Sequence, residues 1–335
     1  MRRPRVKVDG EGFYHVVSRI AGRRFLIDEA EKGILLGTIR AAAAFSGVEV
    51  YSFAIMSNHF HLLVRVPKKT EVSDKELEAR TLALYGPGKF NKVLAKWARW
   101  TRLHQEGRVE NEKARLRARM FDLSQFCKTF KETYTQDYNK RHGNTGSIWE
   151  GRFKSVLLEG SFRALMTVSG YIHLNPVRAT VVERPEDSKW TGYGAGCRGS
   201  SAAQNGLCAL VSRAYGARAK KTAWEEAKAA CAAAMDGRVP NPADSPDVRP
   251  GRAAVPESDV VETDGKGRPL RAGSMRALLM KRSAGFVQGG ALGTDPFLRR
   301  AAKLLPDRIR KRPEALFDRC AFLGLKSAAG VREVS

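Results

Sequence analysis

Residues 48–66 read V-E-V-Y-S-F-A-I-M-S-N-H-F-H-L-L-V-R-V, two apolar runs rich in β-branched residues with a short polar break between them. Runs of this kind predict two neighbouring β-strands. Successive side chains of a strand point to opposite faces, so we expect His59 and His61 on one face and Phe60 on the other, in a core. Two imidazoles side by side can form half of a metal site, and two ordinary strand histidines are the alternative.

The residues before this stretch predict a strand and a helix. Residues 13–20 (F-Y-H-V-V-S-R-I) are rich in residues that favour strands. A helix is expected to begin at Asp28 and to end before Gly47, because apolar residues recur between them at helical spacing. The order of elements is therefore strand, helix, strand, strand.

Residues 68–119 look like a charged insertion, with Pro87 and Gly88 near its middle. Trp97 and Trp100 lie among lysines and arginines in this segment. Two interpretations remain open. The segment is either a basic and aromatic face for phosphates and bases, or an amphipathic helix that packs its tryptophans in a core.

Three further elements complete the region of strong patterning. We predict a helix at 123–141, a strand at 155–159 and a helix at 162–174, after which Pro176 either kinks the helix or follows its end. The aromatic residues of the first of these helices recur at four-residue intervals, which indicates a face that packs on the core. These residues are Phe126, Phe130, Tyr134 and Tyr138.

The composition changes after Gly194, where Gly, Ala and Ser become frequent. We predict an Ala-rich helix at 224–235 and a Pro-rich linker at 240–256. The C-terminal region is again basic and is expected to contain helical patches at 275–281 and 296–305.

The charge balance points to a polyanionic partner. The chain has 59 Lys and Arg against 35 Asp and Glu, a formal charge of +24 in 335 residues. Nucleic acid is the commonest partner of so basic a protein. A membrane partner is disfavoured, because the sequence has no apolar run that could span a bilayer, no signal peptide and no basic helix with an aromatic face.

The cysteines argue against a disulfide framework and against a structural zinc site. There are five, and none forms a Cys-x-x-Cys pair. This pattern favours a reducing cytoplasm.

Tyr171 and Asn175 are four residues apart in the predicted helix and should share one face. An amide oxygen there could be a third ligand for a metal held by His59 and His61. A phenol is mostly protonated at neutral pH and becomes a nucleophile when a metal polarises its electrophile or a neighbour takes its proton. A phosphodiester is the electrophile that the positive charge suggests.

With these residues considered together, the chain resembles the REP-associated tyrosine transposases. These form the bacterial single-tyrosine branch of the HUH endonucleases and are related to IS200-like transposases that act on single-stranded DNA. The matching segments are S-N-H-F-H-L-L-V at 57–64, G-S-I-W-E-G-R-F-K-S-V-L at 146–157 and Y-I-H-L-N-P-V-R-A at 171–179. The resemblance covers residues 12–194.

The resemblance implies an α+β fold of HUH type, with a ferredoxin-like or RRM-like central antiparallel sheet and helices packed on it. We expect a basic, mainly helical C-terminal extension in addition. The catalytic domain would span 1–194, with the charged insertion at 68–119. An Ala/Gly-rich helix and Pro-rich linker would span 195–256, and the basic extension, a candidate DNA-binding region, 257–335.

The resemblance also implies roles for single residues. His59 and His61 match the metal-binding pair, Asn175 stands where relatives carry a third polar ligand, and the metal would be Mg²⁺ or Mn²⁺. Tyr171 matches the nucleophile that becomes joined to the 5′-phosphate of cut DNA and leaves a free 3′-OH. His173 stands where relatives often have an acidic residue, and we expect a neighbour of the site rather than a ligand.

A further set of residues is expected to contact DNA, with core packing as the alternative for the aromatic members of the W-E-G-R-F-K motif. The set is Arg23, Arg24, Trp149, Arg152, Phe153, Lys154 and Arg178.

The expected function is that of a metal-dependent single-strand DNA endonuclease and strand transferase. It would act on palindromic-repeat hairpins through a 5′-phosphotyrosine intermediate, as a monomer or homodimer, without a nucleotide cofactor. We expect it in the bacterial cytoplasm, associated with the nucleoid. The alternative is a regulatory protein that binds DNA or RNA hairpins without cutting them.

Overall fold

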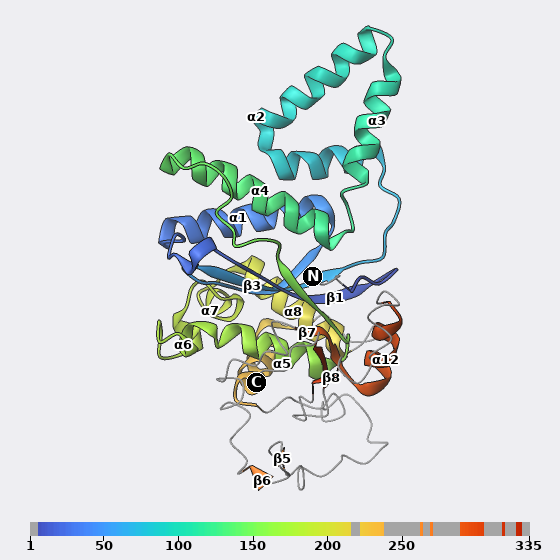
Figure 1. The fold of residues 1–335 in the computed structure, drawn as a ribbon. Coiled ribbons are helices and arrows are strands. Elements are labelled where there is room, and N and C mark those ends of the chain that lie inside the picture. Colours follow the sequence, from blue (N-terminus) through green and yellow to red (C-terminus); the bar gives the residue numbers. More distant parts are fainter. Residues whose placement is uncertain are drawn as a thin grey trace.

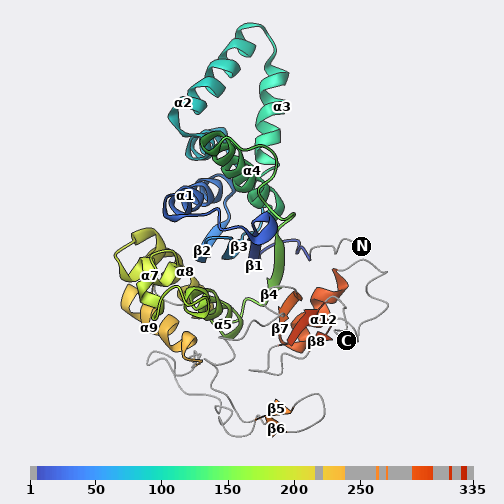
Figure 2. The ribbon, with the colours of Figure 1, turned by 60° about the vertical axis from the view of Figure 1, so that its left-hand side comes forward.

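The centre of the protein is a sheet (Figure 1) in which β2, β3, β1 and β4 lie side by side in that order (Figure 2). The computed structural model describes residues 6–215, 222–237 and 289–304, with short strands at 262–263, 269–270, 317–318 and 326–329. The four strands at the centre of the sheet pair antiparallel throughout. They are β1 (Gly12–Arg19), β2 (Glu49–Ile55), β3 (His59–Val66) and β4 (Lys154–Leu158).

Helices α1 (Glu29–Ser46) and α4 (Leu123–His142) cover one face of this sheet (Figure 1). The limits of α1 follow from its sequence, since the side chain of Asp28 accepts a hydrogen bond from the Glu31 amide and Gly47 ends the helix at a φ of 73°. The aromatic side chains of α4 pack on the core, as their spacing predicted. This packing makes one continuous apolar core with the strands beneath.

The other face is covered by α5 (Phe162–His173), α8 (Ser201–Tyr215) and α9 (Trp224–Met235) (Figure 2). Three short helices lie beside them: α6 (Asn175–Arg178), η2 (Pro185–Asp187) and α7 (Gly192–Cys197). The Ala-rich helix predicted at 224–235 is confirmed by α9, whereas α8 was not predicted. The division at 194/195 stays a prediction, although α8 and α9 lie beyond it and pack on the same sheet.

Helices α2 (Asp74–Arg102) and α3 (Glu106–Arg117) form an arm that projects away from the sheet on the side of α1 and α4 (Figures 1 and 2). α2 bends at Gly86, where φ is 71° and Pro87 follows. Trp97 is buried in a small core that the two helices share. The burial of Trp97 therefore supports the second interpretation of this segment, an amphipathic helix that packs in a core.

The C-terminal region adds strands to the same sheet. β7 (Gly289–Gly293) pairs in parallel with β4, followed by β9 (Lys326–Ala329) and β8 (Phe317–Asp318), which complete seven strands. The helix predicted at 296–305 is present as α12 (Asp295–Lys303). A separate pair is formed by β5 (Glu262–Thr263) and β6 (Pro269–Leu270).

The predicted α+β class with a central antiparallel sheet is confirmed. The extension differs from the mainly helical region that was expected, because its described residues supply strands as well as α12. Short Gly-rich segments such as β7 carry no period of their own, and pairing with β4 decides their conformation. The helical patch at 275–281 and the linker at 240–256 lie outside the described residues. No helix in the described part of the chain is long and apolar enough to cross a membrane.

Candidate active site

The two faces of β3 separate the predicted histidines from the core, as the alternation of the sequence indicated. Phe60 is fully buried towards α4, with its ring centroid 5.5 Å from that of Phe130. His59 and His61 point to the opposite side, with their ring centroids 5.1 Å apart. We call the side of the sheet that carries these two residues the histidine face, and the side that carries Phe60 the apolar face.

A third histidine, His15, joins them from β1. Its Nε2 lies 2.9 Å from Nδ1 of His61, and the two rings stack with centroids 5.1 Å apart. His15 is fully buried. The sequence analysis placed this residue in a strand but missed its partner, because only the register, with Val17 opposite His61, brings the two rings together.

His59 is oriented by its neighbour in the sequence. Its Nδ1 donates to the side-chain oxygen of Asn58 at 2.6 Å, and the Asn58 amide donates in turn to the carbonyl of Arg23 at 3.1 Å. A proton on Nδ1 leaves the lone pair of the neutral ring on Nε2. The loop that carries Arg23 and Arg24 is thus tied beside the histidine pair, with both arginine side chains exposed.

His61 is held neutral by its surroundings. Burial, followed by the nearby His15 and His59, keeps its pKa well below the ordinary value for histidine. Neutral imidazole is the form that binds metals, because a protonated ring has no lone pair to donate.

Tyr171 faces these rings from α5. Its ring centroid lies 5.9 Å from that of His61 and 5.9 Å from that of His15, and both contacts are edge-on. Tyr171 is 2% exposed. The predicted nucleophile and the predicted metal-binding histidine are therefore brought together by the fold.

Asn175 and Arg178 close the site beside Tyr171. The Asn175 amide nitrogen donates to the carbonyls of Tyr171 and Ile172, each at 3.1 Å, and so satisfies the end of α5. The Asn175 side-chain oxygen accepts from the Arg178 guanidinium at 2.6 Å. That guanidinium also lies over the Tyr171 ring, 3.9 Å from its centroid.

His173 lies in the core rather than among these groups. Its Nδ1 accepts from the Tyr193 amide at 3.3 Å, so the proton of the neutral ring is on Nε2, which faces the hydroxyls of Ser169 and Ser52 at 3.1 and 3.2 Å. Burial lowers the pKa of His173 to about 3. Its two nitrogens are thus used in joining α5 to β2 and α7.

The W-E-G-R-F-K motif divides into buried and exposed residues. Trp149 and Phe153 are buried in the apolar core, and the Trp149 indole donates to the Thr135 hydroxyl at 2.8 Å. Their expected contact with DNA is therefore replaced by core packing. Arg152 and Lys154 are exposed.

Arg152 and Lys154 line a surface pocket with a volume of about 200 Å³ at the ends of β1 and β4. Arg19 and Glu150 are its other charged residues. Val17 of β1 pairs with Lys154 of β4 on one side and with His61 of β3 on the other. Paired residues of neighbouring strands share a face, so Lys154 belongs to the histidine face. The pocket places three positive charges next to the histidine pair.

The donors near Tyr171 fit a divalent metal that keeps open positions for its substrate. No cluster of three His, Cys, Asp or Glu that could hold a metal is found among the described residues. His59 and His61 supply two imidazoles, each with Nδ1 already in a hydrogen bond, so we expect coordination through Nε2. Asn175 could add an amide oxygen once Arg178 releases it.

Comparison with known proteins finds a family model that is similar to the N-terminal part. Residues 11–77 match the family model described as IS200-like transposase. These residues hold β1, β2 and β3 with His15, His59 and His61, and the match confirms the resemblance to transposases. A solved structure described as a REP-associated tyrosine transposase bound to a REP hairpin is similar, with 14% identity, a TM-score of 0.37, and coverage of 58% of this chain and 82% of that chain. No curated protein matches the chain.

Proposed function

We propose that this protein is a metal-dependent single-strand DNA endonuclease and strand transferase that acts on palindromic-repeat hairpins. The observation that carries the proposal is the position of Tyr171 against His61 and His15, with ring centroids 5.9 Å apart in both pairs. A tyrosine beside the neutral imidazole of His61 and a basic pocket is suited to phosphoryl transfer, which is mainly positioning and charge stabilisation.

His59 and His61 are the residues that would hold Mg²⁺ or Mn²⁺, with Asn175 as a third ligand. The bound ion would polarise the scissile phosphate and stabilise the charge that develops on it. His15 fixes the orientation of the His61 ring, since its Nε2 is hydrogen-bonded to His61 Nδ1, and Nε2 of His61 is then the nitrogen that would bind the ion.

Tyr171 supplies the nucleophile. Its hydroxyl oxygen forms a bond to phosphorus, the bond from phosphorus to the 3′-oxygen breaks, and the strand remains attached through a 5′-phosphotyrosine. The phenol loses its proton and the leaving 3′-oxygen gains one, so the cut leaves a free 3′-OH. Attack of a 3′-OH on the phosphotyrosine reverses the step and rejoins strands without a nucleotide cofactor.

Arg178 sets the resting state of this site. Its guanidinium covers the Tyr171 ring and holds the Asn175 side-chain oxygen. A DNA phosphate is a stronger partner for guanidinium than a neutral amide, because charged pairs form the stronger hydrogen bonds. Binding of the substrate therefore draws Arg178 away, which uncovers Tyr171 and releases Asn175 as a ligand.

DNA would enter over the exposed basic residues at this end of the sheet. The exposed ones are Arg23, Arg24, Arg152 and Lys154, and the half-buried Arg178 and Arg19 would add to them. The protein would work as a monomer or homodimer in the bacterial cytoplasm, in association with the nucleoid.

A hairpin-binding regulator that does not cut DNA is the second candidate. It is favoured by the burial of Tyr171, which is 2% exposed, and by the hydrogen bond that occupies the Asn175 oxygen. In that case Arg178 would stay in place when DNA binds.

The test is to incubate the purified protein with single-stranded hairpin DNA from its own genomic flanks and Mg²⁺ or Mn²⁺. A protein–DNA adduct on a denaturing gel is expected, and it should be absent without metal and in Tyr171→Phe and His59→Ala. Tyr85→Phe removes a phenol hydroxyl in the arm and serves as the matched control, which should form the adduct normally. Tight hairpin binding with no adduct under either metal would support the regulator instead.

A further inference from the structure

The outer half of α2 is amphipathic, and its two sides have different surroundings. Phe90 and Trp97 are buried, and Trp97 packs with Val109 and Leu116 of α3 in the core of the arm. The opposite side of the helix faces solvent. Packing of α2 on α3 thus explains the apolar residues of the arm. It does not explain the residues on the side of α2 that faces solvent.

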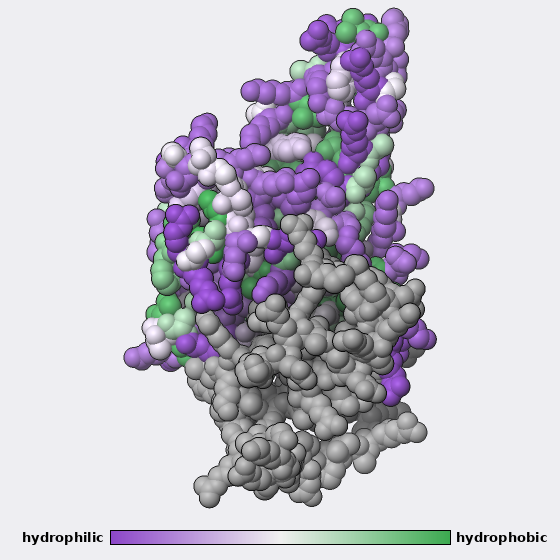
Figure 3. Space-filling view, viewed as in Figure 1, coloured by the Kyte–Doolittle hydropathy of each residue, from purple (hydrophilic) through white to green (hydrophobic). Residues whose placement is uncertain are grey.

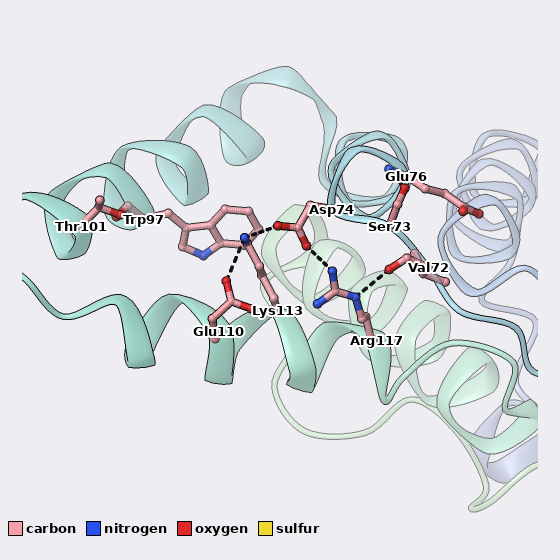
Figure 4. A network of polar contacts seen from close by, with 9 residues as sticks. All are labelled: Val72, Ser73, Asp74, Glu76, Trp97, Thr101, Glu110, Lys113 and Arg117. Atoms are coloured by element: carbon pink, nitrogen blue, oxygen red, sulfur yellow. Dashed lines mark hydrogen bonds and ion pairs between the residues drawn. The ribbon is translucent and has the colours of Figure 1, made fainter.

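The base of the arm is fixed by a network of charged groups (Figure 4). Asp74, at the start of α2, accepts hydrogen bonds from Lys113 and Arg117 of α3. Arg117 also donates to the carbonyl of Val72 at 2.9 Å. Farther out, Lys96 of α2 pairs with Glu112 of α3 at 2.6 Å. These contacts hold the two helices together, so the solvent face of α2 has a defined direction.

Four basic residues occupy that solvent face, and we call them the arm stripe: Lys89, Lys92, Arg99 and Arg102. All four are exposed, and none forms an ion pair with any described residue. Helical spacing places Lys92, Arg99 and Arg102 on the side of the helix opposite Phe90 and Trp97, and Lys89 at the margin of that side. Residues 87–119 contain ten Lys and Arg against three Glu, and no acidic residue lies between 87 and 105. The surface of the arm is largely hydrophilic (Figure 3).

We propose that the arm stripe binds the phosphate backbone of DNA outside the segment that is cut. The stripe rises about 20 Å along α2, which corresponds to about six phosphate steps of one strand. Positive charges that extend along a helix without an acidic partner match the charge of a DNA backbone. This proposal rests on the proposed function, because it takes DNA as the substrate and assigns the DNA that flanks the cut segment to the arm.

The position of the arm separates this contact from the chemistry. The arm leaves the molecule on the side of α1 and α4, whereas Tyr171 lies under the histidine face, on the other side of the sheet (Figure 1). Loss of the stripe should therefore weaken the binding of long DNA and leave the cutting of a short substrate unchanged.

The experiment uses the full-length protein with Lys89, Lys92, Arg99 and Arg102 all changed to Gln. Lys96 is kept because it holds α3. The matched control changes four exposed lysines outside the stripe, Lys68, Lys69, Lys128 and Lys140, to Gln. Two DNA probes are compared over a range of salt concentrations: the repeat hairpin with its cleavage site, and the same hairpin extended by about two helical turns of flanking duplex. Equal melting temperatures of the variants establish that both are folded.

The stripe variant should bind the extended DNA at least about tenfold more weakly than the control, with the slope of log K against log salt reduced by about 0.9 for each lost contact. Binding and adduct formation on the short hairpin should be equal in the two variants. The proposal fails if the control loses as much affinity, or if the loss of affinity is equal on both probes. Absence of an adduct in all proteins would refute the proposed enzyme and leave the comparison of binding intact.

Discussion

The two faces of the central sheet are equally well covered by helices, yet they are built from different side chains. The apolar face is lined by residues such as Phe60, Leu62 and Val64, all fully buried. The histidine face buries His15 and His61 beneath Tyr171 instead. Buried polar groups reduce stability unless each finds a partner, and here the partners are one another. Both faces therefore bury an apolar cluster, and the histidine face holds, within its cluster, a group of polar rings in a fixed arrangement.

Substitutions of two neighbouring residues of β3 test the difference between the two faces most directly. Phe60→Ala should lower the free energy of unfolding by about 3–5 kcal/mol, because it leaves a cavity between Phe130 and Trp149. His61→Ala should cost clearly less stability and should remove metal binding. Urea unfolding of both variants measures the difference. Equal losses of stability would show that the two faces do not differ in this way.

A charged group at the edge of the apolar face provides the second test. Glu31 of α1 is 3% exposed and accepts hydrogen bonds from Arg141 and His142 of α4. Glu31→Gln should lower stability by about 2–3 kcal/mol, since it leaves Arg141 without its charged partner. The change should leave adduct formation intact, because it lies on the opposite side of the sheet from Tyr171.

The pH dependence of Glu31 has a defined sign. Burial alone would raise the pKa of the Glu31 carboxyl, but the hydrogen bonds from Arg141 and His142 hold it below its usual range. The carboxylate therefore stabilises the folded protein above the unfolded-state pKa, and this contribution is lost as the pH falls below it. Urea midpoints between pH 7 and pH 3 should fall less steeply in Glu31→Gln than in the wild type. Parallel curves would contradict this role.

His15 tests whether the histidine face is organised for a metal. His15→Gln removes the ring that orients His61 and should weaken Mn²⁺ binding about 10–100-fold, as measured by titration calorimetry or electron paramagnetic resonance. His104→Gln, in the arm, removes an exposed histidine and should bind Mn²⁺ like the wild type. Unchanged affinity in His15→Gln would limit His15 to a packing role.

The smallest effect is expected at the cover of the nucleophile. Arg178→Lys keeps the charge but loses the planar group above Tyr171, which should lower stability by about 1 kcal/mol or less. Tyr171 should then be nitrated faster by tetranitromethane in the absence of DNA, as followed by mass spectrometry of the peptide that contains it. An unchanged nitration rate would show that Arg178 does not shield the phenol.

Local patterns in the sequence were sufficient for most of the fold and for the main site residues. Alternation placed His59 and His61 opposite Phe60, and the cap residues Asp28 and Gly47 gave the limits of α1. The four-residue spacing placed Asn175 beside Tyr171, where its amide bonds the Tyr171 carbonyl. Each of these signals depends on residues close together in the chain.

The features that were missed depend on contacts between distant segments. His15 became part of the site through the register of β1 with β3. For Trp149 and Phe153 the sequence left both DNA contact and core packing open, and their burial against α4 and the sheet was decided by the tertiary structure. The hydrogen bond from Arg178 to Asn175 required the turn after α5. Tertiary packing, rather than propensity, decided each of these.

The parallel pairing of β7 with β4 has a consequence for how the chain is made. β4 would be an edge strand of the central antiparallel sheet without β7, and its exposed backbone groups would offer a template for other strands. During translation β4 leaves the ribosome long before Gly289–Gly293 is synthesised. In that interval the sheet has an open edge, and nascent chains on the same messenger can associate through it. The last strands to be made therefore protect the first domain from self-association.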